Sequence, residues 1–164
     1  MFCLQAGALN NTMYIDEQTN SRVLKCPAGN STGTISAGNN SLGCNLNPFK
    51  NVAGLAMDSF GNMYRSDSGC DLVLQFPPNS DSTTSGTLKM SGHSNPEHIY
   101  LDPLTNDLYM AMKREHSVLK LAYNNNTPVI LAANNRIQRW LPSAKSGDII
   151  IGSAAGASGT TAIY

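Results

Sequence analysis

The sequence predicts an all-β protein, a β-propeller of four-stranded antiparallel blades, from two recurring intervals. A small polar turn followed by an apolar residue and a tyrosine occurs three times, with spacings of 50 and 45 residues, at Tyr14, Tyr64 and Tyr109. A valine stands nine residues after each of these tyrosines, at Val23, Val73 and Val118. A constant interval between two such anchors predicts a β-hairpin, and four-stranded units of this repeat length are typical of propeller blades.

Each predicted blade contains four short strands in a fixed order. An apolar run that ends at an Asp comes first, as at residues 52–58 and 97–102, and the Tyr strand and the Val strand follow. A strand that begins with Gly closes the unit, as at residues 33–38 and 86–92. Asn, Gly, Pro and Ser fill the turns between strands. No apolar period of 3.6 persists over three turns, which argues against helical solenoids of similar repeat length.

The last unit is incomplete. Residues 136–140 match the Val strand, and Gly147 opens a closing strand ten residues after Ile137, but only 19 residues separate Val118 from Ile137. About half a blade is therefore missing near residues 132–135, where TPVILAA runs directly into another unit. We expect one partial propeller of roughly three and a half blades, which is a fragment, a degenerate copy or a chain that closes its propeller as a homo-oligomer. The expected blade units are about 1–46, 47–94, 95–133 and 134–164.

Charge and hydropathy exclude two classes of partner. Eleven basic and eleven acidic residues give a formal net charge of zero, so the chain lacks the one-signed field that binds DNA. No run approaches the roughly 18 apolar residues of a membrane span, and the start lacks the basic and long apolar regions of a signal peptide. We expect neither DNA binding nor membrane insertion.

The four cysteines leave two interpretations open. They are Cys3, Cys26, Cys44 and Cys70, and they show neither CxxC spacing nor a His at zinc-ligand distance. A structural zinc site is therefore not expected. Two disulfides in an extracellular protein and free thiols packed as small apolar side chains both fit the pattern.

The second unit resembles the NHL repeat almost position for position. The matching stretches are residues 52–58, 61–64, 66–68, Val73 and 76–77. The resemblance covers nearly the whole chain. It implies a six-bladed propeller, often extracellular, that binds proteins, with RNA, glycan or small-ligand binding in some branches. The third unit departs from the pattern, with Met-Ala-Met-Lys at residues 110–113 where the family has Val-Ser-Asp or a similar run.

Two aspartates are candidate metal ligands. Carboxylates at blade edges hold calcium in the related lactonase-like propellers, so Asp58 and Asp102 could contribute to such a site. Calcium takes about six to eight oxygen ligands, which several blades would have to supply. Both residues also occupy a fixed place at the end of the first strand, where Asp commonly bonds the backbone two residues on. Turn capping is therefore the favoured role, and calcium remains the one cofactor considered.

His98 is the third candidate. It stands where the second unit has Gly54, at the start of an inner strand, and could face the channel as a base or metal ligand. The other two histidines, His93 and His116, occupy unrelated repeat positions. A channel site would need such groups on several blades, so we predict no catalytic residue.

A basic stretch in the second half suggests an RNA surface as an alternative. It contains Lys113, Arg114, Arg136, Arg139 and Lys145, with Tyr123 and Trp140 nearby. Trp140, however, aligns with Cys26, Phe76 and Leu121, which predicts a packing role.

We therefore expect a scaffold that binds a protein or ligand through loops at one end of the blades. The variable loops at residues 39–49, 79–85 and 124–128 are the predicted contact regions. One alternative is a lactonase-like or amidating-lyase-like enzyme with a divalent metal in the channel. A second alternative is an RNA-binding NHL domain.

Overall fold

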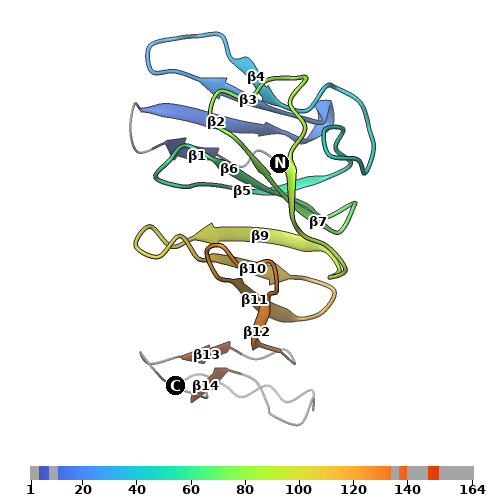
Figure 1. The fold of residues 1–164 in the computed structure, drawn as a ribbon, viewed down its shortest axis with the longest axis vertical. Helices are drawn as coiled ribbons and strands as arrows, with labels where there is room; N and C mark the ends of the chain where they lie inside the picture. Colours follow the sequence, from blue (N-terminus) through green and yellow to red (C-terminus); the bar gives the residue numbers. More distant parts are fainter. Residues whose placement is uncertain (1–3, 8–10, 134–136, 140–147, 152–164) are drawn as a thin grey trace.

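The computed structural model describes residues 4–7, 11–133, 137–139 and 148–151, and gives the side chains of residues 11–133. Three four-stranded antiparallel sheets and a two-stranded sheet follow one another along the chain (Figure 1). A single 3-10 turn, η1 (Gln18–Asn20), is the one helical element of these residues, and it cannot cross a membrane. The all-β prediction, with four-stranded antiparallel units, is confirmed.

We number the sheets 1 to 4 in chain order. Sheet 1 contains β1 (Leu4–Gly7), β2 (Thr12–Glu17), β3 (Arg22–Cys26) and β4 (Thr34–Ala37). Sheet 2 contains β5 (Val52–Met57), β6 (Met63–Asp67), β7 (Leu72–Phe76) and β8 (Thr87–Met90). Sheet 3 contains β9 (Pro96–Leu101), β10 (Leu108–Met112), β11 (Ser117–Leu121) and β12 (Val129–Ala132). Sheet 4 contains β13 (Ile137–Arg139) and β14 (Asp148–Ile151). β1 is the strand that the repeat pattern did not predict, because its four residues lack the closing Asp.

The Tyr-to-Val interval produces the same hairpin register in the three complete sheets. The Tyr of the second strand always faces the residue eleven positions later: Tyr14 pairs with Lys25, Tyr64 with Gln75, and Tyr109 with Lys120. The predicted hairpin is therefore confirmed in each sheet. A constant register places the same repeat position on the same face of every sheet.

A bulge identifies the strands of sheet 4. In sheets 1 to 3 the fourth strand has one extra residue where it pairs with the third strand. The extra residue lies between the partner of the Val and the partner of the residue after the Val. The pairing of β13 with β14 has the same extra residue, since Ile137 pairs with Ile151 and Gln138 with Ile149. Between the first and second strands of sheet 2 the extra residue lies on the first strand instead. Sheet 4 thus corresponds to the third and fourth strands of a blade, as the short interval before Ile137 predicts.

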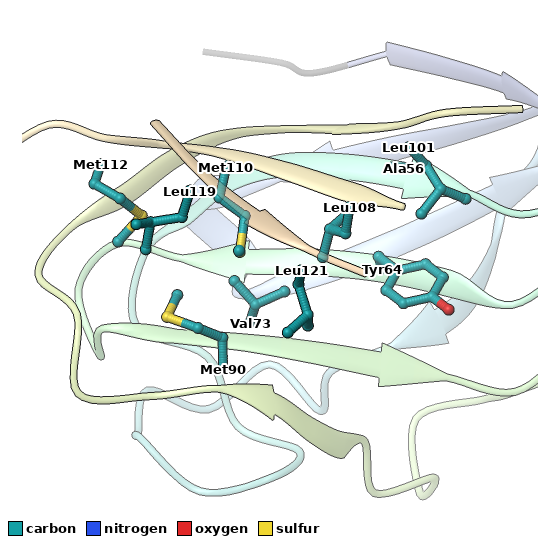
Figure 2. Packing of buried hydrophobic residues seen from close by; sticks show 10 residues of the cluster. All are labelled: Ala56, Tyr64, Val73, Met90, Leu101, Leu108, Met110, Met112, Leu119 and Leu121. Atoms are coloured by element: carbon teal, nitrogen blue, oxygen red, sulfur yellow. The ribbon is translucent and has the colours of Figure 1, made fainter. Parts of the chain in front are cut away.

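Apolar side chains from alternate strand positions fill the two interfaces between complete sheets. The cluster between sheets 2 and 3 is drawn in Figure 2, with Val73, Met90 and Tyr64 facing Leu108, Met110, Leu119 and Leu121. The cluster between sheets 1 and 2 contains Val23, Ala37, Phe49, Val52, Leu55, Met63, Leu74 and Phe76. Each complete sheet therefore packs face to face on the next one, which is the packing expected of propeller blades.

The first strands of neighbouring sheets approach closely at Gly54. A Cβ at this position would lie 3.0 Å from the backbone N of Ile99 and 3.3 Å from the backbone O of Glu97. Both contacts are tighter than ordinary van der Waals contact, so any side chain here would force β5 away from β9. Gly54 is required by this interface.

The linker between sheets 1 and 2 is fixed to sheet 2. A disulfide joins Cys44 to Cys70, with a Cα–Cα distance of 5.2 Å. The backbone N–H of Gly86 donates to the carbonyl of Leu46 at 2.7 Å, and the fully buried Phe49 anchors the end of the linker. Of the four cysteines, two are thus paired, Cys26 is free, and Cys3 lies outside the described residues.

Removing the disulfide should destabilise the protein without changing its fold. The bridge spans a sequence separation of 26 residues, for which chain entropy gives a stabilisation of about 3.5 kcal/mol. Urea unfolding of the double variant Cys44→Ser/Cys70→Ser should show a loss of this size. Cys26→Ser is the matched control and should leave the free energy of unfolding nearly unchanged. Equal stability of the double variant and the wild type would contradict the assigned role.

Candidate functional site

The turns of the chain gather at two ends of the sheets. Because antiparallel strands alternate in direction, the connections from first to second strand and from third to fourth strand share one end, which we call the turn end. Two of the predicted contact loops, residues 79–85 and 124–128, lie there. The third loop, residues 39–49, belongs to a linker that starts at the opposite end. The side chain of Asn47 nevertheless donates to the carbonyl of Ser82 at 2.8 Å, so this loop runs along sheet 2 to meet the second one.

Asp58 caps the first turn of sheet 2. Its Oδ1 accepts the backbone N–H groups of Phe60 at 3.0 Å and Asn62 at 2.8 Å, and its Oδ2 accepts the side-chain amide of Asn62 at 2.7 Å. The carboxylate is buried, so these bonds fix the turn from inside. The predicted turn-capping role of Asp58 is confirmed.

Asp102 makes the equivalent turn in sheet 3. Its Oδ1 accepts the backbone N–H of Leu104 at 2.8 Å, and its carbonyl accepts the N–H of Asn106 at 2.8 Å. His98 lies on β9, the strand that leads to Asp102, but its side chain is exposed and makes no hydrogen bond with described residues. The structure does not bring Asp58, His98 and Asp102 together. Within the described ranges, no three His, Cys, Asp or Glu side chains converge in a metal-ligand arrangement.

The hydroxyl of a buried tyrosine, Tyr64, lies next to the Asp58 carboxylate. The Tyr64 hydroxyl accepts a hydrogen bond from Nε2 of Gln75 at 3.0 Å and lies 3.5 Å from Oδ2 of Asp58. Burial, together with the nearby Asp58 charge, raises the pKa of Tyr64 to about 12. The hydroxyl therefore stays protonated at physiological pH and acts as a structural hydrogen-bonding group.

Two large apolar side chains project from the capped turns into solvent. Phe60 is 63% exposed and Leu104 is 91% exposed, and each stands two residues after the capping Asp of its sheet. Neither residue had been singled out in the sequence. The sequence does contain a signal for them: both stand at the same position after the capping Asp, and the turn needs the Asp but does not need an apolar residue at that position. Tyr123, 46% exposed, lies in the β11–β12 loop at the same end.

A buried charged cluster lies between sheets 1 and 2. The guanidinium of Arg65 is fully buried, sits 3.1 Å from the ring centroid of Phe49, and pairs with Asp67 at 3.4 Å. Asp67 also accepts the backbone N–H groups of Lys50 at 2.9 Å and Asn51 at 3.0 Å, which attaches the linker to sheet 2. The sequence did not predict this cluster, since a charge on a strand ordinarily faces solvent.

Asp16 of sheet 1 completes the cluster. Burial raises the pKa of Asp16 to about 7, against the opposing attraction of Arg65. Burial also lowers the pKa of Arg65 to about 10, which leaves the guanidinium charged at neutral pH. Oδ1 of Asp16 and both Nε and Nη1 of Arg65 have no hydrogen-bond partner among the described residues. The cluster therefore holds a net charge that depends on pH.

Sheet 3 replaces these charges with methionines. Met110 and Met112 occupy the repeat positions of Arg65 and Asp67, and both are buried against sheet 2. This substitution is the departure from the family pattern noted at residues 110–113. An apolar interface needs no buried ion pair, so the departure is explained by packing.

Of the basic stretch considered as an RNA surface, the structure describes the side chains of Lys113 and Arg114. Lys113 is exposed, and its Nζ pairs with Glu97 at 2.6 Å, which neutralises part of its charge. Arg114 is exposed as well. The side chains of Arg136, Arg139 and Lys145, and the predicted packing of Trp140, lie outside the described residues.

Loss of the Asp58 carboxylate should destabilise the fold. Asp58→Ala leaves the N–H groups of Phe60 and Asn62 without acceptors, at an expected cost of about 2 kcal/mol in the free energy of unfolding. We expect calcium to leave the thermal midpoint of the wild type unchanged. A rise in the wild-type midpoint with calcium that Asp58→Ala abolishes would instead assign Asp58 a metal-binding role.

The stability of the protein should fall as pH rises from about 4 to about 7. The pKa of Asp16 is raised in the folded state to about 7 from its ordinary value of 3.8, so the folded chain binds the proton more tightly in this window. Urea midpoints measured across the window should flatten in Asp16→Asn relative to the wild type. Glu17→Gln is the control, because the hydrogen bond from Arg22 lowers the pKa of Glu17, which is the opposite direction to the shift of Asp16, so this variant should keep the fall in stability. An unchanged slope in Asp16→Asn would refute this account.

The arrangement of sheets is that of known β-propellers. A streptogramin B lyase superposes with a TM-score of 0.57 at 12% identity, covering 83% of this chain and 43% of the lyase. A catalytically inactive virginiamycin B lyase from Staphylococcus aureus with quinupristin superposes with a TM-score of 0.57 at 8% identity, covering 79% of this chain and 40% of the lyase.

No protein-family model and no curated protein matches the sequence. The chain spans about two fifths of the length of the two solved propellers. At these identities the likeness concerns the fold. The chain is thus a partial β-propeller made of four-stranded antiparallel blades.

Proposed function

We propose that the chain is an NHL-type propeller scaffold that binds a protein partner through the turn end of its blades. The observation that carries the proposal is the exposure of Phe60 and Leu104 at the same position of consecutive blades. Large apolar side chains at a repeated, solvent-facing position contribute nothing to the turns that present them. They are the kind of side chain that supplies most of the affinity at protein interfaces.

The spacing of the blades suits recognition of an apolar segment. Packed sheets lie about 10 Å apart, so Phe60 and Leu104 form a short apolar row across two turns. Asp58 and Asp102 hold these turns through several hydrogen bonds each, so little conformational entropy is lost when a partner docks. Tyr123 adds an aromatic side chain at the same end.

A catalytic function is the competing proposal, because the two similar structures described above are lyases. The likeness is one of fold, and a shared fold carries no chemistry by itself. Asp58 and Asp102, two of the candidate ligands, are committed to their turns. The described residues therefore favour binding over catalysis.

The proposal is tested by selecting peptides from a random display library on the full chain. Affinities of the selected peptides are then measured by fluorescence anisotropy. We expect Phe60→Ser and Leu104→Ser each to weaken binding at least about tenfold, as loss of a central apolar contact does.

Leu88→Ser is the matched control, since Leu88 is 45% exposed but lies on β8, away from these two turns. It should leave the affinity unchanged. Selected peptides that bind the Phe60 and Leu104 variants as tightly as the wild type would contradict the proposal, as would failure to select any peptide.

A further inference from the structure

Two blades place the asparagine of an Asn-X-Ser/Thr triplet at the same repeat position. Asn30 and Asn125 each begin such a triplet, and each stands seven residues after the Val of its third strand. Two further triplets begin at Asn10, outside the described residues, and at Asn39, in the linker. The triplet is the acceptor sequence for N-linked oligosaccharide. Because a chain rich in Asn, Ser and Thr contains such triplets by chance, their place in the structure decides what they indicate.

Asn30 and Asn125 end the same turn, in the loop between the third and fourth strands of their sheets. The backbone N–H of Asn30 donates to the carbonyl of Pro27 at 3.1 Å, and that of Asn125 donates to the carbonyl of Ala122 at 2.9 Å. The residue before each asparagine has a positive φ. A hydrogen bond from the fourth residue to the first is that of a β-turn, so both acceptors lie in ordered surface turns and not in strands.

The side chains that the modification needs are open to solvent. Asn30 and Asn125 are exposed, and so are the hydroxyl residues of their triplets, Thr32 and Thr127. Neither asparagine uses its Nδ2, the atom that is modified, in a hydrogen bond with a described residue. Oδ1 of Asn125 accepts the backbone N–H of Thr127 at 3.0 Å, which folds this triplet into an Asx turn. An oligosaccharide at either Nδ2 therefore displaces no packed side chain.

The disulfide is an independent observation that points to the same modification. Cys44 and Cys70 are joined, and disulfides persist in secreted proteins and in the oxidising compartments of a cell. N-linked oligosaccharide is attached to proteins that pass through the secretory route. The disulfide and the exposed triplets are thus features of the same cellular environment.

We propose that Asn30 and Asn125 carry N-linked oligosaccharides. In the transfer, Nδ2 forms a bond to the anomeric carbon of the sugar, while the bond from that carbon to a polyprenyl diphosphate donor breaks. The diphosphate leaves with the electron pair of the broken bond, and the amide loses one proton. The modification does not depend on the proposed binding role.

The modified loops share the turn end with the exposed apolar side chains but lie on different connections. Phe60 and Leu104 stand in turns between first and second strands, whereas Asn30 and Asn125 stand in loops between third and fourth strands, toward the other edge of each sheet. Sheet 2 has Ser80 at the repeat position of the two asparagines. The oligosaccharides therefore flank sheet 2 and leave the turn of Phe60 uncovered.

The test is to express the full chain behind a secretion signal in a eukaryotic cell line and to map the modified sites by mass spectrometry. Peptide N-glycosidase converts each modified Asn to Asp, which marks the site. We expect modification at Asn30 and at Asn125. Asn30→Gln should remove one oligosaccharide, and Asn125→Gln and Thr127→Ala should each remove the other. Asn126→Gln is the matched control, because it changes an exposed asparagine beside the acceptor and keeps the triplet, so both oligosaccharides should remain.

Chain that the cells retain is extracted and mapped in the same way, because the oligosaccharide is added before export. An unmodified Asn30 or Asn125 in the expressed chain would overturn the proposal, and so would a modification at Asn125 that survives Thr127→Ala. The peptide affinities that test Phe60 and Leu104 are measured on chain treated with peptide N-glycosidase. The outcome at the two asparagines and the outcome at the apolar row are therefore independent.

Discussion

The structure depends on one constraint, which is that sheet 2 is apolar on both faces. Sheet 2 places Leu55, Leu74 and Phe76 against sheet 1 and Val73 and Met90 against sheet 3. A sheet of this kind cannot be stable alone, because both of its apolar faces would stay in water. Stacking buries both faces of the sheet in the middle, but it leaves the outer faces of sheets 1 and 3 without a complete neighbouring sheet. Apolar surface stays exposed on these outer sheets, as at Met13 of sheet 1, which is 46% exposed, and Tyr100 of sheet 3, which is 60% exposed.

The two complete interfaces meet this constraint by different chemistry. Between sheets 2 and 3, the flexible side chains of Met90, Met110 and Met112 adapt to the shape of the interface and fill it. Between sheets 1 and 2, Arg65 is buried over Phe49 with Asp67 and Asp16 nearby. A buried ion pair contributes little net stability, because desolvation offsets most of the attraction. Asp67 also accepts the backbone N–H groups of Lys50 and Asn51, so only this linker path supplies its carboxylate with these donors.

Strand positions could be predicted from the sequence, because repetition exposes them. The interval from Tyr64 to Val73 recurs, and a fixed interval implies a fixed register. β1 escaped prediction because it has no repeated anchor. The turn caps at Asp58 and Asp102 were predictable as local chemistry. The disulfide was not, since its two cysteines lie 26 residues apart and are joined only by the path of the linker. The burial of Arg65 was not predicted, because strand alternation indicates the face on which a residue lies but not what covers that face.

The turn end is suited to recognition through side chains. Phe60 and Leu104 stand on turns that Asp58 and Asp102 hold with hydrogen bonds, so a partner bound there would be selected by the shape and apolarity of its own side chains. The residues that fix the turns and the residues that face solvent are different ones, so a substitution of Phe60 or Leu104 should leave the fold intact, whereas a substitution of Asp58 should not.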